Sequence, residues 1–127
     1  MSDSEPLSLS VAVGDRDTNA ALLSGAVEPD GVDATVVSEY APVRHRNFFA
    51  HGEYDVAEVS LASYLSSRAT SESDATAVPV FTNKRFRHAF FYKHADADVD
   101  GPADLAGKKV GIQSWQTTAN VWMRGLC

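Results

Sequence analysis

Apolar strand-like stretches alternate with helix-like segments along this chain, and this alternation limits the possible fold more than any other feature. Residues 7–14, LSLSVAVG, alternate leucine and valine with small residues, and residues 54–59, YDVAEV, form another strand-like stretch. Each is followed by a segment with helix signals, NAALLSG at 19–25 and SLASYLSSR at 60–68. Strands that alternate with helices build α/β folds with mainly parallel sheets. We therefore predict an α/β fold.

The same alternation continues through the rest of the sequence. Residues 27–40 predict a strand or hairpin arm around the turn at Pro29–Gly31, and Pro42 and Gly52 are placed to begin and end a helix. Residues 69–76 predict a polar surface loop. Further strands are predicted at AVPVF (77–81), HAFFYKH (88–94) and KKVGI (108–112), a short helix at 102–106, and a last helix within 114–125.

The charge balance disfavours nucleic acid as a partner. Seventeen acidic residues against 11 basic ones give a formal net charge of -6, whereas binding to a phosphate backbone requires a basic face. Lysine occurs four times and aspartate 11 times, which resembles the acidic surfaces of proteins from salt-loving organisms. Ordinary solubility is the simpler explanation of this composition.

Cysteine content and hydropathy exclude other classes. Cys127 is the single cysteine, so no disulfide and no cysteine-based metal cluster can form within these residues. No apolar stretch approaches the roughly 18 residues of a membrane helix. The start, MSDSEPLSLSVAV, lacks a basic segment followed by an apolar run. We expect no membrane insertion and a cytoplasmic location, and we leave the oligomeric state open, a homo-oligomer included.

Four polar stretches lie at predicted strand ends, where α/β proteins bind ligands. They cover residues 14–17, 58–64, 84–88 and 113–120. Helix N-termini carry a partial positive charge and unpaired N–H groups, so Ser60 and Ser63, or Thr117 and Thr118, are suited to hold a carboxylate. Alternatively, Ser60 and Thr117 are plain N-caps that need no ligand.

The stretch KRFRH at 84–88 is basic in an otherwise acidic sequence. An arginine can clamp a carboxylate with two parallel hydrogen bonds, and a nearby histidine carries protons near neutral pH. The alternative is a solvated loop. The other histidines, His45, His51 and His94, have no spacing with carboxylates that specifies a metal site. We predict no metal and no cofactor.

Four segments, taken in order, resemble a known family. They are LSVAVGDRDTNAALLSGAVEPDGVD (9–33), YDVAEVSLASYLSSR (54–68), AVPVFTNKRFRH (77–88) and DLAGKKVGIQSWQTTANVWMRG (104–125). Their order and spacing resemble the N-terminal part of the 4,5-dihydroxyphthalate decarboxylase family, over nearly the whole chain. That family is similar in architecture to the type 2 periplasmic solute-binding proteins, in which two α/β lobes close over a ligand.

The resemblance implies a domain arrangement. Residues 1–95 would form the first lobe, with a mainly parallel sheet, residues 96–107 an acidic connection, and residues 108–127 the first strand and helix of a truncated second lobe. Because a complete family member is longer, the resemblance implies a truncated chain that can be inactive by itself.

The resemblance also implies a reaction, the loss of carbon dioxide from a dihydroxylated aromatic dicarboxylate. Such a reaction needs an acid, a base and donors for the retained carboxylate. His88 and Glu58 are the candidates for proton transfer, and Asp15 is placed to orient Arg16. The candidates for binding a small aromatic or carboxylic acid are Arg16, Asp15, Ser60, Ser63, Tyr64, Arg87, Gln116, Thr117, Thr118 and Asn120. Trp115 is a candidate for stacking on the ligand, whereas Trp122 is expected in the core.

Two other functions remain open at this point. A solute-binding protein of an ABC transporter would use the same helix starts and arginines to capture a small organic acid, without a positioned acid group. The lack of an export signal disfavours it. An inactive remnant of either protein is the third interpretation.

Overall fold

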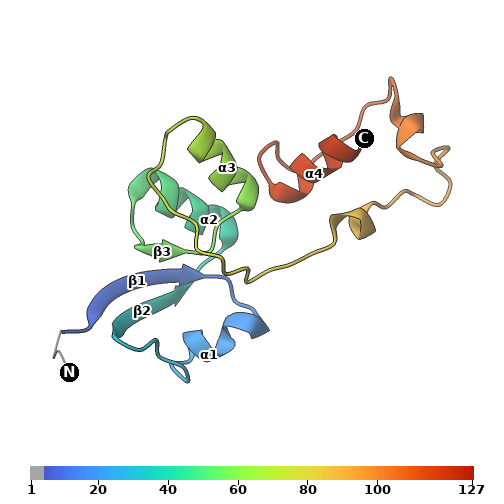
Figure 1. Cartoon of the computed structure of the whole chain (residues 1–127). Coiled ribbons are helices and arrows are strands. Elements are labelled where there is room, and N and C mark those ends of the chain that lie inside the picture. Colours follow the sequence, from blue (N-terminus) through green and yellow to red (C-terminus); the bar gives the residue numbers. More distant parts are fainter. Residues whose placement is uncertain (1–4) are drawn as a thin grey trace. The chain divides into compact units, whose positions relative to one another are not determined.

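The computed structural model describes residues 5–127, which form two units (Figure 1). Within the described chain, unit 1 consists of residues up to 59 together with 75–82, and unit 2 consists of residues 60–74 and 83–127. The lobe boundaries expected at residues 95 and 107 stay a prediction.

Unit 1 is built on a three-stranded parallel sheet with the strand order β2-β1-β3. Its strands are β1 (Leu7–Val13), β2 (Val32–Ser38) and the short β3 (Val56–Ala57). Strand β1 pairs with β2 along its whole length, from Leu7 opposite Val32 to Val13 opposite Ser38, and with β3 at Val11 and Ala12. The α/β class with a parallel sheet is therefore confirmed, and residues 27–40 contribute a parallel strand rather than a hairpin arm.

Helical segments connect these strands. A 3₁₀ turn η1 (Asp17–Asn19) and α1 (Ala20–Leu23) link β1 to β2, and α2 (Ala41–Arg46) with the π-helical turn η2 (Asn47–His51) links β2 to β3. Pro42 lies in the first turn of α2, as predicted. Gly52 ends η2 in the left-handed conformation, with φ at 62°, which a residue without a Cβ adopts most readily.

Unit 2 contains two nine-residue helices and two short 3₁₀ turns. The helices are α3 (Leu61–Ala69) and α4 (Thr118–Leu126), and the turns are η3 (Arg87–Phe90) and η4 (Pro102–Leu105). Helices were predicted in all of these places except at η3.

Three predicted strands are wrong. Residues 77–81 and 108–112 are not helical or strand-like, and residues 88–94 begin in η3 and continue as coil. Most of their apolar side chains are exposed, with Val80 at 69% and Tyr92 at 85%. A strand is stabilised by pairing with a neighbour, and none of these segments pairs with another strand of the described chain. The apolar composition of these segments indicates a β preference, but it does not show whether a neighbouring strand is present for pairing.

The apolar core of the described chain is small. Among residues 5–127, the buried hydrophobic side chains are Ala12 and Val13, both on the central strand β1. The buried polar side chains of Arg44 and Asn19 lie in the same unit, and those of Ser67 and Asn120 lie in unit 2. The buried apolar side chains of residues 5–127 thus lie at the end of β1, which borders the polar cluster described next.

Candidate functional site

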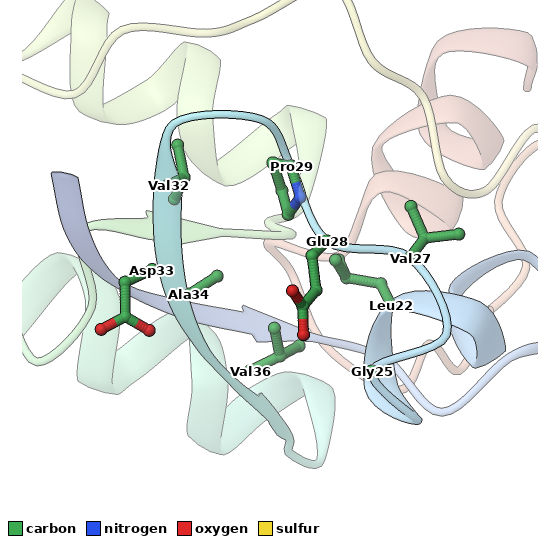
Figure 2. A pocket seen from close by; sticks show the side chains of 9 residues that line it. All are labelled: Leu22, Gly25, Val27, Glu28, Pro29, Val32, Asp33, Ala34 and Val36. Carbon is green, nitrogen blue, oxygen red and sulfur yellow. The ribbon is translucent and has the colours of Figure 1, made fainter. Parts of the chain in front are cut away.

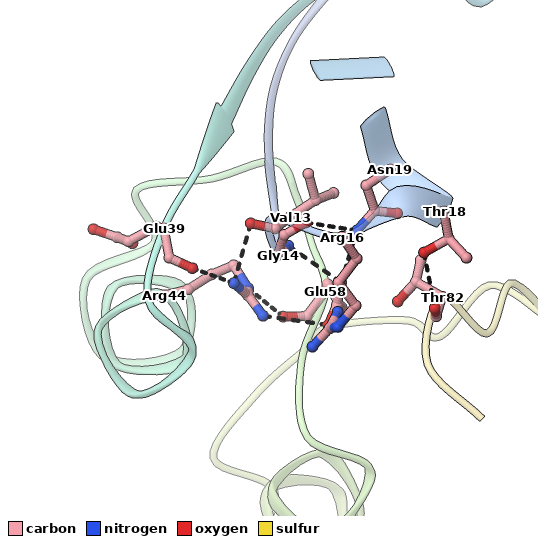
Figure 3. A network of polar contacts seen from close by, with 9 residues as sticks. All are labelled: Val13, Gly14, Arg16, Thr18, Asn19, Glu39, Arg44, Glu58 and Thr82. Atoms are coloured by element: carbon pink, nitrogen blue, oxygen red, sulfur yellow. Dashed lines mark hydrogen bonds and ion pairs between the residues drawn. The ribbon is translucent and has the colours of Figure 1, made fainter. Parts of the chain in front are cut away.

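A polar cluster surrounds Glu58, which directly follows β3 (Figure 3). One carboxylate oxygen, Oε1, forms an ion pair with Nη1 of Arg16 and lies 3.4 Å from Nη2 of Arg44. The other, Oε2, accepts hydrogen bonds of 3.2 Å from the backbone N–H of Gly14 and from the amide of Asn19. The Glu58 carboxylate therefore contacts four polar groups. We call these five residues the Glu58 cluster.

Strand topology explains why these residues meet. Gly14 follows β1 and Glu58 follows β3, and the carboxyl ends of parallel strands share one edge of a sheet. Asn19 in η1 is buried and also donates to the carbonyl of Gly14 at 2.8 Å. The backbone at Gly14 suits this approach, because a Cβ there would lie 2.8 Å from Nη1 of Arg16.

Hydrogen bonding keeps Glu58 ionised. Burial raises the pKa of Glu58, but hydrogen bonds from Arg16, the Gly14 N–H and Thr82 outweigh burial and hold the pKa below its ordinary value. Burial lowers the pKa of Arg44, and the charge of Glu58 opposes that shift. Arginine remains protonated in proteins, so the five residues hold two cations and one anion, and the charge of Glu39 also acts on Arg44.

The start of helix α3 contacts the start of helix α4 in unit 2. Ser60 is the N-cap of α3, and its hydroxyl lies 2.8 Å from the hydroxyl of Thr118, the first residue of α4. The Thr118 hydroxyl also accepts a 3.2 Å hydrogen bond from the backbone N–H of Ala62, and Ser60 accepts one of 3.5 Å from Ser63. The structure thus brings together two predicted groups that are 58 residues apart.

Other predicted residues of the last helix have different surroundings. Thr117 is the N-cap of α4, and its hydroxyl oxygen is buried without a hydrogen-bond partner in the part of the chain that the structure describes. Asn120 is buried and donates to the carbonyl of Ser114 at 2.7 Å, which occupies part of its amide. Gln116 is exposed, and Tyr64 is half-buried on α3.

His88 lies among aromatic rings of unit 2. Its ring centroid is 4.7 Å from that of Phe86 and 6.1 Å from that of Trp122. Trp122 is 46% exposed, so its predicted place in the core is wrong. Trp115 is 70% exposed, and the guanidinium of Arg124 stacks 3.6 Å from its ring centroid. Arg87 is half-buried in η3.

Two residues of the Glu58 cluster were missed by sequence reasoning, and one predicted pairing is replaced. Arg44 and Asn19 carry no motif; an arginine within the half-apolar helix APVRHRNFF is the sole signal for the first. Asp15 is exposed, and the partner of Arg16 is Glu58, 42 residues away.

A pocket of about 140 Å³ lies elsewhere in unit 1, between α1, the following loop and β2 (Figure 2). Its lining combines apolar side chains with polar groups, and its charged side chains are the carboxylates of Glu28 and Asp33, which would repel an anion. None of the predicted site residues lines it. Within residues 5–127, no helix is long and apolar enough to cross a membrane, and no three His, Cys, Asp or Glu side chains are grouped as metal ligands.

Comparison with known proteins gives two related sequences. The chain is 42% identical over 118 residues to the 4,5-dihydroxyphthalate decarboxylase of Comamonas testosteroni and 40% identical over 118 residues to that of Pseudomonas putida. These matches cover 93% of this chain, but 36% and 46% of the two relatives. No family model matches the sequence. The resemblance inferred from the motifs is confirmed: over 118 residues, this chain is similar to two proteins named 4,5-dihydroxyphthalate decarboxylase, and it spans less than half of their length.

Proposed function

We propose that this chain is part of a carboxy-lyase of the 4,5-dihydroxyphthalate decarboxylase type, acting on a small aromatic carboxylic acid. The observation that carries the proposal is the 42% identity over 118 residues to a protein of that name. The type 2 periplasmic-binding-protein-like lobe is part of the same proposal, supported by the parallel order β2-β1-β3.

The reaction sets clear chemical demands. In 4,5-dihydroxyphthalate, a proton adds to the ring carbon that bears the leaving carboxylate, while the hydroxyl para to it supplies electrons. The carbon–carboxylate bond then breaks, carbon dioxide leaves, and its bonding electrons restore the aromatic ring, giving 3,4-dihydroxybenzoate. The protein must therefore bind the retained carboxylate and provide one proton donor.

Each polar cluster offers carboxylate binding by itself. Arg16 is half-buried, and the Glu58 contact engages its Nη1; a guanidinium has five N–H donors, so others remain for a substrate carboxylate. In unit 2, the N-termini of α3 and α4 supply partial positive charge and the hydroxyls of Ser60 and Thr118.

We assign proton transfer to His88 and the holding of Arg16 to Glu58. With a pKa below the ordinary carboxyl value, Glu58 is ionised at neutral pH and a poor proton donor. His88 has aromatic neighbours rather than an ion-pair partner within the described chain, and its side chain is exposed, so a substrate can reach it.

The test is to incubate the protein with 4,5-dihydroxyphthalate and to measure carbon dioxide and 3,4-dihydroxybenzoate. The expected result is stoichiometric formation of both. We expect His88→Ala to lose turnover while binding is kept, and Arg16→Met and Arg87→Ala to weaken binding. Arg46→Met is the control, because Arg46 is exposed on α2. Binding without turnover in the parent would contradict the lyase proposal and support a solute-binding protein.

A further inference from the structure

Arg44 is the most deeply buried charged group of the described chain. It lies on α2, its side chain is 1% exposed, and it is the largest fully buried side chain among the described residues. Taking a guanidinium out of water costs several kcal/mol unless its donors are matched by acceptors. The acceptors that surround the Arg44 guanidinium therefore indicate its role.

The Arg44 guanidinium binds three backbone carbonyls. Nε donates to the carbonyl of Glu58 at 2.7 Å, and Nη1 donates to the carbonyl of Val13 at 3.1 Å and to that of Glu39. Val13 ends β1, Glu39 follows β2, and Glu58 follows β3. One side chain therefore holds the carboxyl ends of all three strands of the sheet, as Figure 3 shows around Arg44.

The fourth contact of Arg44 is with the Glu58 carboxylate, which in turn binds Arg16. Nη2 of Arg44 lies 3.4 Å from Glu58 Oε1, the same oxygen that forms the ion pair with Arg16. Arg44 thus fixes both the backbone and the carboxylate of Glu58, and Glu58 in turn fixes the Arg16 guanidinium. Arg16 is more accessible than Arg44, with 31% of its side chain exposed.

We propose that Arg44 is a positioning residue: by binding the three strand ends and the Glu58 carboxylate, it fixes the Arg16 guanidinium for a carboxylate ligand. This inference rests on the proposed function for the identity of the ligand. The chain of contacts Arg44–Glu58–Arg16 is independent of the proposed function, because it can be measured without any ligand.

The experiment compares Arg44→Lys with Arg46→Lys, a conservative change at an exposed position of the same helix. A lysine has one ammonium and cannot reach three carbonyls and a carboxylate together. NMR would follow the Arg16 Nε–H resonance and the titration of the Glu58 carboxyl, and calorimetry would give the Kd for 4,5-dihydroxyphthalate. For Arg44→Lys we expect a shifted Arg16 resonance and a raised Glu58 pKa. We also expect about tenfold weaker binding of 4,5-dihydroxyphthalate, which corresponds to the loss of one charged hydrogen bond. Arg46→Lys should change none of these.

The outcomes separate the possible roles. If Arg44→Lys lowers the free energy of unfolding but leaves the Arg16 resonance, the Glu58 titration and the Kd unchanged, Arg44 is structural and the inference is overturned. If that variant does not fold, Glu58→Gln tests the same chain of contacts, and unchanged Arg16 resonances and Kd there would overturn it. If the parent binds no 4,5-dihydroxyphthalate, the proposed function fails, while the two NMR measurements still decide the role of Arg44.

Discussion

At the scale of single residues, the Glu58 cluster has features of a site as well as of a structural bridge. A structural bridge between one arginine and one carboxylate would be neutral, whereas here two guanidinium groups share one carboxylate. Arg44 is enclosed, but Arg16 remains partly accessible. An accessible cation that is held by a buried network is pre-organised for an anion, because little side-chain freedom remains to be lost on binding.

Gly14→Ala should displace Arg16 without unfolding the protein. The new methyl group would lie 2.8 Å from Nη1 of Arg16, and a flexible side chain gives way more easily than backbone. We expect weaker binding of 4,5-dihydroxyphthalate with a free energy of unfolding within about 1 kcal/mol of the parent. Calorimetry and urea unfolding measure the two quantities. Gly111→Ala is the control, because a methyl group added at Gly111 would meet nothing within 4 Å; equal binding by both variants would contradict this prediction.

Glu58→Gln should destabilise the protein in a pH-dependent way. The folded pKa of Glu58 lies below its ordinary value of 4.5, so the folded state binds this proton less readily than the unfolded state. The stabilisation is complete above pH 4.5 and is lost as pH falls through the folded pKa. Urea unfolding at neutral and acidic pH should show the variant less stable at neutral pH, with the difference shrinking in acid. A difference that is constant with pH would argue against an ionised Glu58.

Sequence reasoning found some residues of the site and missed others for a physical reason. Ser60 was predicted because an N-cap depends on a local pattern, a hydroxyl before a helix, and the structure confirms it as the cap of α3. Arg44 contacts residues 5, 14 and 31 positions away in the sequence. Such contacts depend on how three strands assemble, which no local pattern records.

At the scale of elements, the same distinction separates correct predictions from wrong ones. Strand β1 and the helices α2 and α3 were predicted from turn residues and local periodicity. Residues 77–81 and 108–112 have similar apolar patterns but lie in coil, because a β preference needs a neighbouring strand to become a ladder.

Ser60→Ala should weaken the start of helix α3. The serine hydroxyl accepts from the Ser63 N–H and contacts the Thr118 hydroxyl, and loss of an N-cap costs about 1 kcal/mol. Hydrogen exchange of the first α3 amides should accelerate, and so should that of the first α4 amides. Ser66→Ala, on the same helix, is the matched control. If acceleration is confined to α3, the contact between Ser60 and Thr118 does not contribute to stability.

At the scale of the whole molecule, the two units differ in how their interiors are built. In unit 1, the buried set includes Ala12 and Val13, and hydrogen bonds join all three strand ends through Arg44. In unit 2, the buried side chains of the described residues are Ser67 and Asn120, both polar. Apolar burial is the main source of folding free energy, so unit 1 should be the more stable.

This difference predicts the order in which the units open. With rising urea, amides of β1 in unit 1 should keep their protection from hydrogen exchange longer than amides of α3 and α4, because local stability follows buried apolar contacts. Residues 108–112 should exchange fastest, since their backbone forms no strand pairing in the described chain. Exchange measured by mass spectrometry at several urea concentrations would resolve these segments. Simultaneous loss of protection in β1, α3 and α4 would mean that both units unfold as one cooperative structure. That result would contradict the prediction that the apolar side chains buried on β1 make unit 1 the last to unfold.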